Sequence, residues 1–290
     1  MAGGLKEVRE RIGSVQNTMQ ITSAMKMVSA AKLRRAQDAI TRMRPYAEKI
    51  QTILANVSAT LDSSEGVFSQ ERNVKKALVV CITSDRGLCG AFNNNNIKIA
   101  KEIIRENEAK GIKTFVLPLG KKSVEAFTGN RPEGFELVAI FADLNFDASS
   151  EVAEFIMNGY LKGDWDSVKI AYSKFKNAAV QIPTNEKFLP LLPEEVEEES
   201  SSNQVEYIFE PNREEIVENI IPSALKIQLY KALLDSHASE HGARMTAMHS
   251  ATENAGELLN ELKISYNKAR QASITTEILE IVAGSEALEG

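Results

Sequence analysis

The sequence predicts an antiparallel coiled coil of long N- and C-terminal helices that carries a central Rossmann-like α/β domain. Both ends of the chain place apolar residues at alternating spacings of three and four, whereas the middle has short β-prone runs separated by helical patterns. Aromatic residues make up only 6% of the chain, and this composition favours helix over sheet. We therefore expect a coiled-coil helix over 1–62, an α/β domain over 75–211 and a second coiled-coil helix over 212–290.

The N-terminal block predicts one helix with a narrow apolar seam. The alternation is seen first at Leu5, Val8, Ile12, Val15 and Met19, and again at Ala36, Ile40, Met43, Ala47, Ile50, Leu54, Val57 and Leu61. Two apolar positions in every seven are typical of a coiled coil rather than of a globular helix. The interval of seventeen residues between Met19 and Ala36 predicts a break in this repeat.

The C-terminal block, from about 222 to 288, follows the same rule with smaller residues. Its seam comprises Leu225, Leu229, Ala232, Ser236, Ser239 and Ala243, and then Met248, Thr252, Ala255, Leu259, Leu262, Tyr266, Ala269 and Ser273. Because so many of these residues are Ala, Ser or Thr, the partner helix must approach closely. Two such helices at opposite ends of a chain can bury their seams against each other.

The middle block predicts a small parallel or mixed sheet. Strands are expected at 77–83, 114–117, 137–141, 168–172 and 205–209, the last at the sheet edge. Helices are expected at 94–110, ending at Gly111, and at 150–161, capped by Ser149 or Ser150. The segment 190–204 carries five Glu and three consecutive Ser, which predicts a surface excursion of unknown purpose.

Charge and cysteine content exclude several classes of protein. The net charge is −6, which argues against a nucleic-acid partner, although residues 1–50 alone carry a net +6 and predict an acidic partner surface or a solvated helix face. Two cysteines form no disulfide framework, so a reducing compartment is expected. No apolar run is long enough to span a bilayer, and no secretory leader is recognisable.

The loop after the first predicted strand occupies the place where phosphate-binding loops lie. Asp85, Arg86, Gly87 and Cys89 belong to it, but it matches no nucleotide-binding motif, so a tight turn with local hydrogen bonds is favoured. Catalysis by Cys89 would need a histidine, and His237, His241 and His249 all lie in the C-terminal helix. Those histidines have a spacing that a metal could use, but a surface or seam role is favoured, and no cofactor is expected.

Three separated segments resemble the γ subunits of F-type ATP synthases. They are residues 12–37 (IGSVQNTMQITSAMKMVSAAKLRRAQ), residues 84–90 (SDRGLCG), and residues 239–248 with 267–284 (SEHGARMTAM and NKARQASITTEILEIVAG). The segments occur in the family's order at both ends and the centre of the chain. The chain is therefore identified as a member of this family, with Ser285 standing where the family usually has Ala.

The resemblance implies a central rotor stalk without a catalytic site, present in one copy within a hetero-oligomer. Its partners would be the α and β subunits, the ε subunit and the membrane c-ring, on the cytoplasmic face of the bacterial inner membrane. The implied β-subunit contacts are Met25, Lys26, Arg244, Arg270, Gln271 and Thr275. The implied contacts with the c-ring and ε are Tyr207 and Glu210.

Two other classes of function remain open at this point. A coiled-coil scaffold with an α/β cap that never rotates would self-associate. An enzyme using the loop 85–93 would bind small ligands as an isolated chain.

Overall fold

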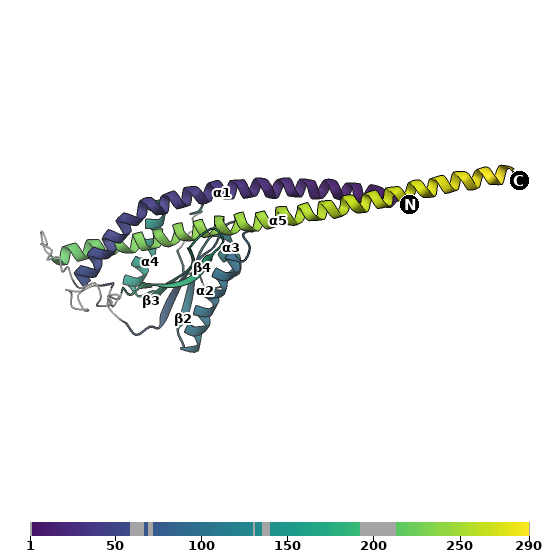
Figure 1. Ribbon diagram of the computed structural model, residues 1–290. Coiled ribbons are helices and arrows are strands. Elements are labelled where there is room, and N and C mark those ends of the chain that lie inside the picture. Colours follow the sequence, from purple (N-terminus) through teal and green to yellow (C-terminus); the bar gives the residue numbers. More distant parts are fainter. Residues whose placement is uncertain are drawn as a thin grey trace. The chain divides into compact units, whose positions relative to one another are not determined.

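A computed structural model describes residues 2–58, 67–68, 72–129, 131–134, 140–191 and 213–289. Two long helices, α1 (Ala2–Ser58) and α5 (Arg213–Glu289), flank the sheet-forming residues in the sequence (Figure 1). The chain divides into two compact units, one of Met1–Ser29 with Arg244–Gly290 and the other of Ala30–Ala243. Both long helices contribute to both units.

The first unit is an antiparallel pair of helices. Contacting residues have increasing numbers in α1 and decreasing numbers in α5. Arg9 hydrogen-bonds Tyr266 at 2.7 Å. Thr22 bonds Thr252 at 2.8 Å, and Lys26 bonds His249 at 3.3 Å. The predicted seam is confirmed, because every seam position from Leu5 to Met19 is half-buried while all but one of the positions between them are exposed. On α5, Met248, Ala255 and Leu259 are buried.

The predicted break in the α1 repeat is wrong. Four residues continue the alternation of three and four between Met19 and Ala36, and each is buried or half-buried: Thr22, Lys26, Ser29 and Leu33. The prediction counted apolar residues alone, and three of these four are polar. A seam with hydroxyl and amine groups is unusual, because such groups must find partners across the interface.

The second unit is built on a four-stranded mixed sheet in the order β2-β1-β3-β4. The predicted strands at 77–83, 114–117 and 168–172 are confirmed as β1 (Lys76–Ile82), β2 (Lys113–Leu119) and β3 (Ser167–Phe175). β1 pairs in parallel with β2 and β3, and β4 (Gln181–Leu189) pairs antiparallel with β3. The hairpin strand β4 was not predicted, because its polar sequence and Pro183 weaken the strand signal.

Both faces of this sheet are covered by helices. Leu78, Val80 and Ile82 of β1 point to a core formed with α4 (Phe146–Lys162) and with the Ile221–Leu233 part of α5. Val79 and Cys81 point to the other face, where α2 (Phe92–Ala109) packs with Ala100 and Ile103. The continuous apolar sequence of β1 follows from this arrangement, since neither of its faces meets water.

Helix boundaries differ in part from the predicted ones. α2 and α4 are confirmed, but α4 begins at Phe146 and its cap is Asn145, whose side chain accepts from the Ala148 amide at 2.8 Å. The predicted Ser149 cap is buried inside the first turn instead. The short helix α3 (Lys121–Ala126) was not predicted. Ile140 and Phe141 form a turn, whereas residues 137–139 and the predicted strand 205–209 lie outside the described residues.

Candidate functional site

The six residues implied as β-subunit contacts all belong to the two-helix unit. Arg270, Gln271 and Thr275 are exposed on α5, where the Thr275 hydroxyl donates to the Gln271 carbonyl at 3.0 Å. Met25 and Lys26 are half-buried on α1. Arg244 is buried, with 7% of its surface exposed.

Large apolar side chains are exposed on the same unit. On α1 they are Ile21, Met27 and Val28, each more than half exposed. On α5, Leu258 and Ile264 are exposed before the seam position Ser273, and a denser group follows it: Ile274, Ile278, Leu279, Ile281 and Val282, of which Ile281 is 71% exposed. Exposed apolar groups at this density are typical of a surface that binds another macromolecule.

A polar cluster crosses the seam beside Met25. The Lys26 ammonium hydrogen-bonds Nδ1 of His249 at 3.3 Å, and Nε2 of the same ring lies 3.6 Å from Glu253 Oε1. One helical turn away, the Thr252 hydroxyl donates to the Thr22 hydroxyl at 2.8 Å. The sequence contained a signal for this cluster. If the seam is assigned from the alternating spacing of three and four alone, without regard to residue type, Thr22, Lys26 and Thr252 are seam positions.

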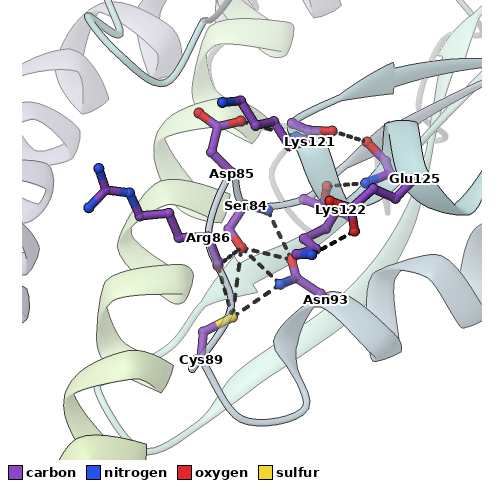
Figure 2. Close-up of polar contacts among 11 residues, drawn as sticks. Ser84, Asp85, Arg86, Cys89, Asn93, Lys121, Lys122 and Glu125 are labelled. Atoms are coloured by element: carbon purple, nitrogen blue, oxygen red, sulfur yellow. Dashed lines mark hydrogen bonds and ion pairs between the residues drawn. The ribbon is translucent and has the colours of Figure 1, made fainter. Parts of the chain in front are cut away.

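The loop after β1 is closed by its own hydrogen bonds (Figure 2). Asn93 accepts from the Ser84 amide at 2.9 Å through Oδ1 and donates through Nδ2 to the Ser84 hydroxyl at 2.8 Å and to Cys89 Sγ at 3.2 Å. The Ser84 hydroxyl also donates to the Arg86 carbonyl at 2.6 Å. The local hydrogen bonds predicted for this loop are therefore confirmed.

The same loop is tied to the end of β2. The Asp85 carboxylate accepts from the Lys121 amide at 3.0 Å, and the Thr83 hydroxyl accepts from the Ser123 amide at 2.8 Å. These two side chains therefore provide hydrogen-bond acceptors for backbone amides at the start of α3. Gly120 has φ 102°, and a Cβ there would lie 2.1 Å from the Thr83 carbonyl oxygen, so only glycine fits.

Leu88 is the residue that this loop presents outward. It is 63% exposed and has φ 61°, the left-handed region that leucine rarely adopts. Gly87 and Cys89 flank it, and the Arg86 side chain points away from the buried network (Figure 2). Backbone strain of this kind concentrates at functional surfaces, and an exposed aliphatic side chain can contribute packing to a partner but no acid, base or nucleophile.

The cysteines and histidines of the described chain form no metal centre. Both cysteines are buried, and burial raises the pKa of Cys81 to about 12. His237 and His241 lie on α5 with their Nε2 atoms 3.1 Å apart, and no group of three His, Cys, Asp or Glu in the described chain is arranged to hold a metal ion. No helix among the described residues is both long and apolar enough to cross a membrane.

A half-buried polar network joins α5 to the sheet. Tyr172 donates to Glu186 at 2.6 Å, and Gln228 of α5 donates to the other oxygen of Glu186 at 2.7 Å. Burial raises the pKa of Asp235 to about 6 against the opposing effects of Lys231 and Lys174. Sequence patterns missed this network, because its members come from three separate elements.

Comparisons with known proteins agree with this architecture. A family model described as ATP synthase matches residues 4–288. The chain is 54% identical over 287 residues to the ATP synthase gamma chain of Flavobacterium johnsoniae and 42% identical over 286 residues to that of Geobacter metallireducens, and each alignment covers 99% of both chains. Relatives this similar over their whole length establish the family.

Solved structures share the fold at lower identity. A chain in the rotor of the Euglena gracilis mitochondrial ATP synthase superposes with a TM-score of 0.66 at 22% identity, covering 94% of this chain and all of that one. A chain in the central stalk and c-ring structure of the Tetrahymena thermophila enzyme gives a TM-score of 0.56 at 24% identity, covering 80% of this chain and 99% of that one. The chain therefore belongs to the ATP synthase γ-chain family, the non-catalytic central-stalk subunit of that complex.

Proposed function

We propose that this chain is the rotating shaft that couples proton flow through a c-ring to ATP synthesis and hydrolysis at β subunits. The two-helix unit would turn inside a ring of α and β subunits, and one copy would serve the whole complex. The related mitochondrial chains belong to structures described as rotor, central stalk and c-ring. The bacterial relatives favour a peripheral position on the cytoplasmic face of the inner membrane.

One observation carries this proposal: the apolar side chains at the C-terminal end of α5 are exposed. Ile274, Ile278 and Ile281 lie beyond the seam, and water is a poor environment for them. A collar formed by other subunits would cover them without fixing them, since branched aliphatic groups make no directional bonds.

Met25, Lys26, Arg244, Arg270, Gln271 and Thr275 are proposed as the residues that contact β. The exposed Arg270, Gln271 and Thr275 would form transient hydrogen bonds with β. Lys26 would contact acidic side chains of β. Arg244 is buried, so its contact would require β to reach into the seam or Arg244 to shift outward.

The c-ring and ε contacts proposed at Tyr207 and Glu210 lie outside the described residues. The loop residues Asp85, Arg86, Gly87 and Cys89 are proposed to hold Leu88 toward a partner of the same complex. The mutual bonding of Ser84, Asn93 and Cys89 supports a structural part for this loop.

The test combines assembly with activity. The full chain is mixed with α and β subunits from the same source, and the mass of the complex and its ATPase rate are followed together. A single copy per complex with a raised ATPase rate supports the shaft. A homodimer with no effect on ATPase would favour the static scaffold.

Matched variants sharpen that test. Gln271→Leu and Thr275→Leu should lower coupled turnover without changing the helical circular dichroism signal, whereas the exposed Glu277→Gln, two residues from Thr275, should act like the parent. Full rates in both Leu variants would remove these residues from the β contact.

A further inference from the structure

We propose that His249 is a positioning residue for Lys26, holding the lysine ammonium at the helix surface by one displaceable hydrogen bond. This inference rests on the proposed function, in which Lys26 meets carboxylates of a β subunit. The juxtaposition that carries it is a lysine on a coiled-coil seam position paired with a half-exposed imidazole of the opposite helix.

The contact fixes which ring nitrogen carries the proton. An ammonium group can only donate, so Nδ1 of His249 must accept from Lys26 Nζ across their 3.3 Å separation. In the neutral ring the proton then lies on Nε2, which faces Glu253 Oε1 at 3.6 Å. Glu253 therefore favours the tautomer that leaves Nδ1 free to accept.

The surrounding seam holds the two partners at a constant separation. Thr22, four residues before Lys26, is hydrogen-bonded to Thr252, three residues after His249. Ser29 and Met248 are buried beside them. These contacts favour one register of the two helices at this point, and that register places Lys26 beside His249.

A neutral acceptor suits a contact that forms and breaks repeatedly. A carboxylate at position 249 would hold Lys26 in an ion pair and compete with the acidic partner, and an aliphatic residue would leave the long side chain to sample many rotamers. A half-exposed histidine avoids both effects. Its hydrogen bond orients the Lys26 ammonium, and a stronger acceptor on the partner can replace that bond. The side chain of His249 is 51% exposed, so a partner can reach the pair.

The first experiment tests the geometry without any partner. The three histidines of the full chain are labelled with ¹⁵N, and the His249 shifts are assigned with His249→Gln. We expect a hydrogen-bonded, unprotonated Nδ1 in the neutral ring, and Lys26→Met should move that resonance. A proton on Nδ1 in the parent, or no response to Lys26→Met, would overturn the inference.

The second experiment uses the assembled complex and measures coupled proton pumping against ATP hydrolysis. His249→Gln keeps a neutral acceptor and should retain the parent ratio. His249→Leu should lower that ratio about threefold through loss of one hydrogen bond, and His249→Glu should lower it because an ion pair would hold Lys26 away from the partner. In a Lys26→Met background, His249→Leu should have no further effect. Equal ratios for the Gln and Leu variants would overturn the inference.

These outcomes distinguish the positioning role of His249 from the proposed contact between Lys26 and β. If Lys26→Met couples as well as the parent, the proposed β contact of Lys26 fails. If Lys26→Met lowers coupling while His249→Leu does not, that contact stands and the positioning role of His249 fails.

Discussion

The Thr252 hydroxyl of α5 donates a hydrogen bond to the Thr22 hydroxyl of α1 at 2.8 Å, joining two residues that are 230 positions apart in the sequence. Thr22 is 9% exposed, so its hydroxyl has little access to water. The pair favours one register of the two-helix unit, because a slip by one residue would break the cross-helix bond and leave each hydroxyl only the carbonyl of its own helix, Met19 or Met248.

Replacing one threonine of this pair should lower the free energy of unfolding more than replacing both. Thr22→Val or Thr252→Val leaves one hydroxyl without its cross-helix partner and should lower the free energy of unfolding by about 1 kcal/mol, whereas the double Val variant should regain most of that loss. Urea unfolding followed by circular dichroism measures this. Thr18→Val, at an exposed position, is the control, and additive losses in the double variant would contradict the coupling.

The Asn93 amide should protect the Cys89 thiol. Asn93→Ala removes the partner of the Ser84 amide and the shortest hydrogen bond to Cys89, so the loop should open and Cys89, now 1% exposed, should react at least tenfold faster with a disulfide reagent. Cys81, a buried residue of β1 that packs against α2, should stay unreactive. Asn94→Ala changes an exposed neighbour and is the control, and slow labelling in Asn93→Ala would show that the bonds are dispensable.

Asp235 should make stability fall as pH rises between about 4 and 6. Burial raises its pKa in the folded protein to about 6, so in this window the folded chain holds a proton that the unfolded chain has released. Asp235→Asn should therefore increase the free energy of unfolding above pH 6 by up to roughly 3 kcal/mol, with a smaller effect near pH 4.

Urea unfolding at a series of pH values measures this dependence. Asp164→Asn, which removes an exposed carboxylate of the same unit, is the matched control. The opposite sign, with Asp235→Asn less stable at neutral pH, would mean that Lys231 and Lys174 outweigh the burial of the carboxylate.

Gly159 should tolerate no side chain. A Cβ at this position of α4 would lie 2.0 Å from Cζ2 of Trp165, whose ring is buried and whose Nε1 donates to the Ile156 carbonyl. Gly159→Ala should therefore lower the melting temperature by roughly 6–12 °C, as expected for overpacking of about 3 kcal/mol. Gly13→Ala, in a helix with open space around it, should be neutral or stabilising, and equal effects of the two changes would contradict the packing.

Local patterns predicted most of the fold. Periods of three and four indicate helix and a run of apolar residues indicates a buried strand, and both signals depend on neighbours within a few positions. The confirmed seam positions in α1 and α5 and the three confirmed strands β1, β2 and β3 are of this kind. The cap at Asn145 was missed because Ser149 and Ser150 offer the same chemistry nearby, and only packing decides which side chain reaches the free amides.

The sequence by itself determined that two long helices pair through a weakly apolar seam and that a small α/β domain lies between them. It also carried the motifs that placed the chain in its family. Only the tertiary structure decided that Lys26 meets His249, that Asn93 closes the loop around Cys89, and that Asp235 is buried beside Lys231. Each of these contacts joins side chains from elements distant in the sequence, or depends on a local arrangement that produces no periodic pattern of residues. Apolar burial is non-directional and leaves a repeating signal, whereas a hydrogen bond between two particular groups leaves none.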